Sequence, residues 1–179
     1  MANYLQIKVK VNSKACWYSE LQSKIAALGI NNVNWQDGHF HITMLFVNDD
    51  KHVEELTHGF SQCLSSYSAF PLTIDKLDAF TTGSGHEHVI YLTSTQIPSQ
   101  LLSLANDVRV MADGLKANYD RRPFKPHITL GRVPVNQITL EQLQTILQTI
   151  KLPTFECILK ETEYRYLRRN SIRSWKLNP

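Results

Sequence analysis

The chain has 179 residues, of which 42% are hydrophobic and 20% are charged, and its formal net charge at pH 7 is +3. That length and apolar content predict one domain over residues 1–179, or two small lobes sharing a core, that folds unaided. The charge is too small to predict a partner by itself. Three features exclude the secreted and membrane classes of protein. The three cysteines are widely spaced and form no C-x-x-C pair, the first segment is unlike a signal peptide, and no apolar run is long enough to cross a bilayer. We therefore expect a soluble, cytoplasmic monomer.

Periodicity in the first half of the chain predicts three strands and two helices. The strands cover residues 5–11, 39–47 and 70–74, and the helices cover residues 18–28 and 53–67. Gly29 should end the first helix, because glycine readily takes the left-handed conformation at a helix C-terminus. Asn48-Asp49-Asp50 should cap the second helix, because short oxygen-bearing side chains accept bonds from the free N–H groups there.

After a loop rich in glycine and serine over residues 81–88, the second half repeats the rhythm of strands and helices. The predicted elements are strand 89–93, helix 98–117, a strand from residue 127, a helix opened by a capping box at Thr139-Leu140-Glu141-Gln142, strands 155–159 and 164–167, and an extended end through Trp175. Each half therefore places a helix, a strand and a second helix between strands, which is a faint internal repeat.

This repeat favours an α+β protein made of two related lobes, with antiparallel sheets, flanking helices and a central cleft between the lobes. The alternation of strands and helices is also compatible with a parallel doubly wound sheet. That alternative ranks second, because no glycine-rich turn joins a strand to a helix.

A His-x-Thr motif lies on a predicted strand in each half: His41-Ile42-Thr43-Met44 and His127-Ile128-Thr129-Leu130. Because side chains alternate along a strand, each histidine shares a face with the threonine two residues on. In the first motif the opposite, core-facing side should carry Phe40, Ile42, Met44 and Phe46. A single motif of this kind is common on strand surfaces, whereas two in matching contexts can bring both histidines to one cleft.

The segment Arg122-Pro123-Phe124-Lys125-Pro126-His127-Ile128-Thr129-Leu130 resembles the second motif of the 2H phosphoesterases. It is most similar to their bacterial branch, the RNA 2′,3′-cyclic phosphodiesterases long called 2′-5′ RNA ligases. The resemblance covers nearly the whole chain in length and motif placement. It implies a metal-independent phosphodiesterase acting on 2′,3′-cyclic phosphate ends of RNA, or on 2′-5′ linked or cyclic nucleotides, with 2′-5′ ligation as the back reaction. The first motif is less specific, because His39 offers a second histidine on the face of His41.

Two histidines and two threonines suit the cleavage of a phosphodiester. One group must take a proton from the attacking oxygen and another must deliver one to the leaving oxygen, and each positioned transfer contributes roughly 10²–10⁴-fold. Imidazole titrates near neutral pH, so two histidines can hold opposite protonation states. The resemblance implies His41 as the proton donor and His127 as the proton acceptor. The Thr43 and Thr129 hydroxyls would stabilise the charge that develops on the phosphate oxygens.

Basic and aromatic residues around the second motif are candidate contacts to an RNA or nucleotide substrate. The resemblance makes Phe124 a base-stacking candidate, although a residue between two prolines also suits packing. Arg132 could reach phosphate or form a salt bridge, and Arg122 and Lys125 flank the motif. A second basic cluster near the C-terminus consists of Arg165, Arg168, Arg169, Arg173 and Lys176, interleaved with Tyr164, Tyr166 and Trp175, whose strand spacing also suits a core.

Two alternatives come from other classes of protein. His86 and His88, with Glu87 between them, suggest a metal site, but no third ligand stands at a suitable spacing. We therefore expect no metal and no other cofactor, and a metal-dependent hydrolase is a minor alternative. A non-catalytic RNA-binding protein that keeps the fold is the main alternative to an enzyme, although the presence of both histidines and both threonines argues against it.

Overall fold

The computed structural model describes residues 1–12, 14–167 and 170–179, so Arg168 and Arg169 of the C-terminal basic cluster lie outside the described part of the chain. The helices of that part are α1 (Cys16–Ala27), α2 (Val53–Leu64), α3 (Ser99–Gly114) and α4 (Leu140–Gln148). Its strands are β1 (Asn3–Lys8), β2 (Asn34–Trp35), β3 (His41–Val47), β4 (Phe70–Ile74), β5 (Lys76–Thr81), β6 (Glu87–Thr93), β7 (Ile128–Pro134), β8 (Phe155–Leu159), β9 (Glu161–Tyr166) and β10 (Ser171–Lys176).

The main sheet has the strand order β10-β9-β1-β3-β7-β6-β5, and the short strand β2 pairs with β7. Strands β4 and β8 form a separate two-stranded ribbon. Every pair of named strands in the described residues is antiparallel. The α+β prediction with antiparallel sheets is therefore confirmed, and the parallel doubly wound alternative is wrong.

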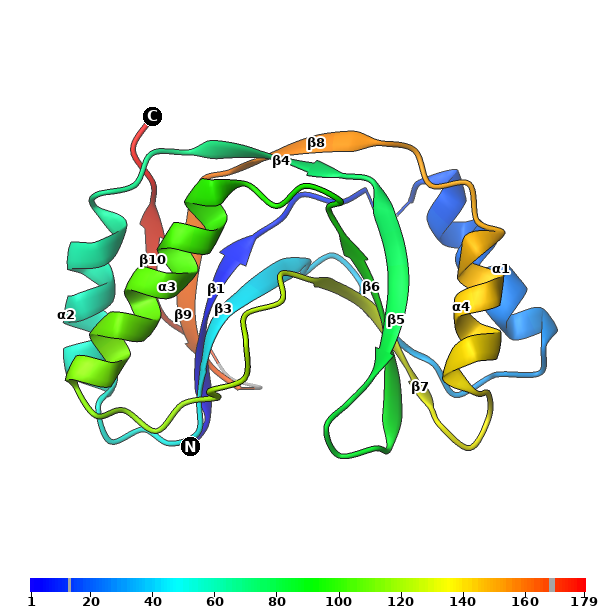
Figure 1. Cartoon of the computed structure of the whole chain (residues 1–179), viewed down its shortest axis with the longest axis horizontal. Helices are drawn as coiled ribbons and strands as arrows, with labels where there is room; N and C mark the ends of the chain where they lie inside the picture. Colours follow the sequence, from blue (N-terminus) through cyan, green and yellow to red (C-terminus); the bar gives the residue numbers. More distant parts are fainter. Residues whose placement is uncertain (13, 168–169) are drawn as a thin grey trace.

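The sheet consists of two lobes that meet between β3 and β7. The only register pair recorded there is Ile42 opposite Ile128, so the strands diverge on either side of this contact. We call β10, β9, β1 and β3 with α2 and α3 the first lobe, and β2, β7, β6 and β5 with α1 and α4 the second lobe. Figure 1 shows the two lobes as the sides of an arch, with the β4–β8 ribbon running across its top.

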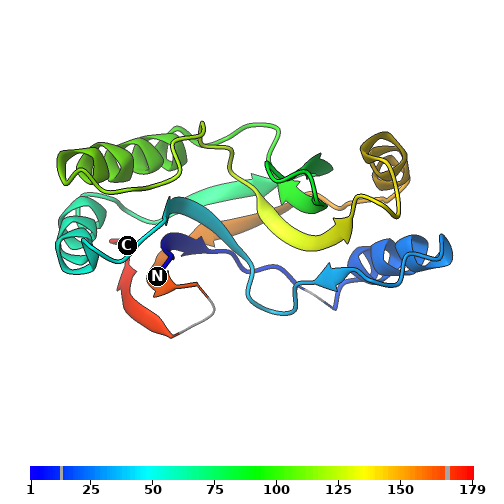
Figure 2. The ribbon, with the colours of Figure 1, turned by 90° about the horizontal axis from the view of Figure 1, so that it is seen from below.

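The two halves of the sequence are exchanged between the lobes. Helix α1 follows β1 of the first lobe but packs beside α4 in the second, whereas α3 follows β6 of the second lobe but packs against α2 and β3 in the first. The view from below shows the same grouping, with α2 beside α3 at one end and α1 beside α4 at the other (Figure 2). The internal repeat thus gives two related lobes, each built from both halves of the chain.

Local sequence signals explain some element boundaries and miss others. The capping box at Thr139 forms as predicted, with the Thr139 hydroxyl accepting from the Gln142 backbone N–H and the Gln142 side chain accepting from the Thr139 N–H. The cap predicted for α2 is wrong, because its N-cap is His52, whose side chain makes no capping hydrogen bond. Strands β2 and β5 were not predicted, and the loop predicted over 81–88 shrinks because Thr81 pairs with His88 across the β5–β6 hairpin.

The apolar residues of the sheet lie under the helices as one continuous core. Tyr164 is completely buried there, and its hydroxyl donates to the side-chain oxygen of Asn3, which confirms the core interpretation of that tyrosine. No helix in the described residues has both the length and the apolar character required to cross a membrane.

Candidate active site

A β-bulge follows each His-x-Thr motif at the same position. Between β1 and β3 the register passes from Leu5–Leu45 to Gln6–Thr43, which leaves Met44 without a partner. Between β6 and β7 it passes from Ile90–Gly131 to Tyr91–Thr129, which leaves Leu130 without a partner. Each unpaired residue comes three positions after the histidine. Bulges are frequent beside active sites, because the extra residue redirects the side chains around it.

The bulges change which side chains share the face of the histidines, here called the histidine face. Before the bulge this face carries His41 and Thr43, as predicted. After it, Leu45 is buried, and the half-buried Phe46 stacks on Tyr4, whose ring also stacks on His41. The prediction that Phe46 faces the core is therefore wrong, because the bulge reverses the alternation expected of a regular strand.

The bulge in β7 is held in place by residues of the second lobe. The Leu130 carbonyl accepts from the Gln36 backbone N–H at 2.8 Å, and the Tyr18 hydroxyl shares its proton between the Gln36 carbonyl at 2.7 Å and the Leu130 carbonyl at 3.1 Å. The Trp35 indole lies directly over Gly131, where the position of an added Cβ would be only 2.7 Å from Cε3 of that ring. Glycine is therefore required at this position by the close approach of the tryptophan ring and not by its own backbone angles.

The two catalytic candidates are oriented by the same local device. His41 Nδ1 donates to the carbonyl oxygen of His39 at 3.0 Å, and His127 Nδ1 donates to the carbonyl oxygen of Lys125 at 2.8 Å. A carbonyl can only accept, so Nδ1 carries the proton in both rings. Each neutral imidazole therefore presents the lone pair of Nε2, and each protonated one presents an Nε2–H. This is the arrangement that lets either ring take or give a proton at Nε2.

The surroundings of the two rings differ. His41 stacks on Tyr4 with ring centroids 5.7 Å apart. His127 meets the edges of Phe80 and Tyr91, at centroid distances of 5.3 and 5.8 Å. These three aromatic neighbours were not predicted, because β5 was missed and because only the register shows which side chains of β1 and β6 lie beside a histidine.

Burial lowers the pKa of both His41 and His127 below the usual value of 6.5. The hydrogen bonds to the two carbonyls oppose this effect in each case. Among the nearby charges, His127 and Arg165 lower the pKa of His41 and Glu163 raises it by less, whereas Arg132 and Arg122 further lower the pKa of His127.

The two threonines have hydroxyls with unused hydrogen-bonding capacity. Thr43 and Thr129 are half-buried on the histidine face, and neither hydroxyl bonds to another residue in the described ranges 1–12, 14–167 and 170–179. Both can therefore donate to a ligand oxygen without breaking a bond inside the protein. Their β-branched side chains also limit the number of rotamers that binding has to freeze.

The candidate substrate residues around the second motif differ in position. Arg132 lies on the histidine face after the bulge, and its guanidinium pairs with Glu87 at 3.3 Å. Arg122 is exposed and pairs with Asp120. Its guanidinium also lies close to Gly83 in the β5–β6 loop, where an added Cβ would be 3.2 Å from Nη1.

Lys125 and Phe124 stand in the lead-in to β7. The Lys125 side chain is exposed, and its carbonyl orients His127. Phe124 is half-buried and packs against the core, so packing is its observed contact, and base stacking stays a prediction. The end of this lead-in is fixed by the Thr93 hydroxyl, which donates to the Pro126 carbonyl at 2.8 Å.

The histidines considered as metal ligands have other surroundings. His88 is buried in β6, where Nδ1 meets the Thr81 hydroxyl at 3.0 Å and Nε2 donates to the Ile138 carbonyl at 3.0 Å. His86 is exposed in the hairpin loop. Within the described part of the chain, no three His, Cys, Asp or Glu side chains are arranged to hold a metal ion.

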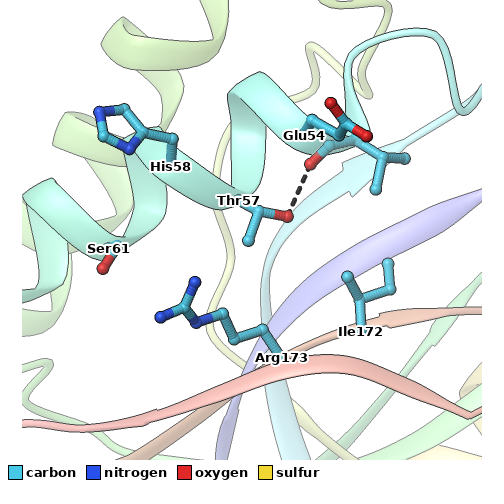
Figure 3. A pocket seen from close by; sticks show the side chains of 7 residues that line it. Glu54, Thr57, His58, Ser61, Ile172 and Arg173 are labelled. Carbon is cyan, nitrogen blue, oxygen red and sulfur yellow. Dashed lines mark hydrogen bonds between the residues drawn. The ribbon is translucent and has the colours of Figure 1, made fainter.

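A hollow of about 470 Å³ lies between α2 and the edge strand β10 (Figure 3). It includes His58 of α2, together with Glu54 and Arg173. One hydroxyl in it is already used, because Thr57 donates to the Val53 carbonyl at 2.6 Å. His41 and His127 are not among the residues that line it.

Comparisons with known proteins identify the family. The model of the 2′-5′ RNA ligase superfamily matches residues 31–166, so the chain belongs to this superfamily. No curated protein sequence matches the chain. Similar solved structures include a phosphoesterase (TM-score 0.60, 19% identity, 100% of both chains), E. coli LigT complexed with 3′-AMP (0.58, 18%, 100% of both) and Kluyveromyces marxianus Usb1 (0.65, 10%, 98% of both). At these identities the likeness shows the shared fold.

Proposed function

We propose that the protein is a metal-independent phosphodiesterase that opens 2′,3′-cyclic phosphate at RNA ends and leaves a 2′-phosphate. The observation that carries this proposal is the matched pair of imidazoles, each fixed through Nδ1 to a carbonyl two residues earlier and each presenting Nε2. The family supports a reaction at a phosphodiester of RNA. The structure of E. coli LigT contains 3′-AMP, a nucleotide with phosphate on its ribose, which supports a ribose phosphate as the ligand here.

In the proposed reaction His127 acts as the base and His41 as the acid. Nε2 of His127 takes a proton from water, and the water oxygen forms a bond to phosphorus. The bond between phosphorus and the ribose 3′ oxygen breaks, and that oxygen receives the proton of His41 Nε2. The Thr43 and Thr129 hydroxyls donate to the non-bridging oxygens while their negative charge grows. Proton exchange with water then restores both imidazoles.

The surroundings of His127 support its role as the base, because Arg132 and Arg122 favour the neutral form that a base needs. Two charges act in opposite directions on His41: Arg165 favours its neutral form, and Glu163, with the smaller effect, favours the protonated form that an acid needs. Arg132 lies on the histidine face beside Thr129 and would attract the phosphate. The cytoplasmic location and the monomeric state stay predictions from the sequence.

The test compares two leaving groups in the variants His41→Ala and His127→Ala. A ribose oxygen leaves poorly without a proton, whereas nitrophenolate leaves readily. His41→Ala should therefore lower cleavage of the cyclic phosphate about 10²–10⁴-fold and lower cleavage of a nitrophenyl phosphodiester much less. His127→Ala should lower both, because water must be activated in either case.

His39→Ala is the control for the competing histidine of the first motif. This variant keeps the backbone carbonyl that orients His41, and the His39 side chain is exposed, so turnover of a cyclic mononucleotide should stay near that of the wild type. Rescue of His127→Ala by the good leaving group would show that the two roles are reversed. If the wild-type protein does not cleave the cyclic phosphate, the proposed function is refuted.

A further inference from the structure

A groove of about 400 Å³ begins beside His41 and is lined by residues of β1, β8 and β9 and by the segments next to β1 and β3. One wall is Gly38-His39-Phe40, the segment immediately before His41. On the neighbouring strand Lys8 also lines the groove and is the register partner of His41. The groove is therefore continuous with the first histidine.

Positive charge gathers along this groove. Its cationic side chains are Lys8, Lys10, Lys160 and Arg165, and its carboxylates are Glu161 and Glu163. Glu163 is only 8% exposed and is held inside the protein by the Gln6 amide at 2.8 Å and by the Lys8 ammonium at 3.7 Å.

Two of these cations are free to meet a ligand. Lys10 and Lys160 are exposed, and neither forms an ion pair with another residue that the structure describes. Next to them Ile158 is 57% exposed and adds an apolar surface to the groove. A groove lined with positive charge that tracks the sugar–phosphate backbone is one of the features that bind a single nucleic-acid strand.

At two corresponding positions of the second lobe an uncharged residue replaces the cation. Lys8 of the first lobe corresponds to Thr93 of the second lobe. Lys8 follows Ile7, which pairs with Ile42, and Thr93 follows Leu92, which pairs with Ile128. Arg165 corresponds to Phe80 in the same way. Arg165 lies two strands away from Phe46, and Phe80 lies two strands away from Arg132. The two sides of the catalytic centre are thus alike in backbone and different in charge, so a bound strand would have a defined direction.

We propose that this groove binds the sugar–phosphate chain upstream of the terminal cyclic phosphate, so that the preferred substrate is an oligoribonucleotide and not a cyclic mononucleotide. The inference rests on the proposed function, in which water attacks from the side of His127 and the ribose oxygen leaves on the side of His41. Attacking and leaving oxygens lie roughly in line in phosphoryl transfer. The ribose, and the chain attached to its 5′ oxygen, therefore lie on the side where the groove begins.

The experiment compares two double variants. The groove variant is Lys10→Gln/Lys160→Gln, and the control is Lys51→Gln/Lys151→Gln, which removes the same charge from exposed lysines that do not line the groove. Each protein is assayed for kcat/KM on adenosine 2′,3′-cyclic phosphate and on a hexaribonucleotide ending in 2′,3′-cyclic phosphate. The wild type should prefer the hexamer about tenfold or more. The groove variant should lose most of that preference and keep its activity on the mononucleotide, whereas the control should match the wild type. The salt dependence of hexamer binding should also fall by about 1.4 in logarithmic slope, because each phosphate contact to a single strand contributes about 0.7.

Several results would overturn the inference. Equal kcat/KM for the two substrates in the wild type, or equal losses in the groove and control variants, would show that the groove does not bind the strand. If neither substrate is cleaved, the proposed function fails, and the groove is then judged by the fluorescence anisotropy of a 5′-labelled hexamer with a 3′-phosphate. Weaker binding by the groove variant alone would support the groove, and unchanged binding would refute it.

Discussion

Substitution of Gly131 by alanine should destabilise the protein and slow its reaction, because it places a methyl group in contact with Trp35. The added carbon would lie 2.7 Å from Cε3, 3.0 Å from Cζ3 and 3.3 Å from Cδ2 of the indole. Carbon atoms prefer separations of about 3.5–4.0 Å, so the ring has to move by about 1 Å. That movement is opposed on two sides, since Trp35 pairs with Gly131 through the backbone and meets the edge of Tyr18 at 5.9 Å.

The expected magnitude is the difference between two opposing effects. Overpacking of a well-filled site costs about 1–3 kcal/mol. Replacing glycine by alanine within a strand recovers about 0.5–1 kcal/mol of backbone entropy. The free energy of unfolding should therefore fall by about 1–2 kcal/mol, which corresponds to a decrease in Tm of about 2–8 °C for a chain of this size. Turnover should also fall, because Thr129 and Arg132 lie on either side of this glycine along the histidine face.

Thermal unfolding followed by circular dichroism measures the effect, and Gly114→Ala is the matched control. Apart from its chain neighbours and the backbone of α3, no atom of the described residues lies within 4 Å of the Cβ position at Gly114, the last residue of α3, so alanine should stabilise the protein there by about 0.5–1 kcal/mol. In a Trp35→Ala background the change at Gly131 should no longer destabilise. Equal stability of Gly131→Ala and the wild type would refute the argument, and so would a loss that persists without the tryptophan.

Three other predictions concern the catalytic groups. Thr43→Ala or Thr129→Ala should lower kcat by less than either histidine substitution, by about 10-fold to 10³-fold, because each removes one hydrogen bond to a developing charge; turnover equal to wild type would exclude that hydroxyl as a phosphate ligand. The pH profile of kcat/KM should be bell-shaped with its maximum below about pH 6.5, because burial lowers the pKa of both His41 and His127 and one of them must be protonated. A profile that is flat from about pH 5 to 9 would contradict paired-histidine catalysis. Excess EDTA should leave kcat unchanged, because the histidines and threonines account for proton transfer and charge stabilisation; inactivation that added Zn²⁺ or Mg²⁺ reverses would contradict the metal-independent reaction.

The parts of the fold that the sequence predicted are those encoded by neighbouring residues. The alternation along the first motif predicted a core-facing side, and Phe40, Ile42 and Met44 of that side are buried. The threonine and glutamine spacing at Thr139 predicted the capping box that opens α4. Each of these features depends on a few consecutive positions, so no knowledge of the tertiary structure was needed.

The parts that could not be predicted depend on which strands meet. An extra residue in β3 cannot be recognised from the letters around Met44, because the bulge exists only relative to β1. The side of Phe46 was therefore assigned incorrectly. The same reason hides Glu163 and Phe80 from a sequence-based search for site residues, since β9 and β5 come near the histidine strands, across β1 and β6, only after the whole sheet has formed.

The position of β1 between β3 and β9 has a consequence for the synthesis of the protein. Asn3 to Ile7 pair with residues 162–166, so β1 leaves the ribosome long before its partner strand β9. Until β9 has emerged, β1 keeps one edge unpaired, and unpaired edges in incomplete chains favour aggregation. The pairing of β1, the strand beside His41, is therefore completed only after residue 166 has been translated. A nascent chain that stops before residue 160 would carry both histidines without a finished first lobe to hold them.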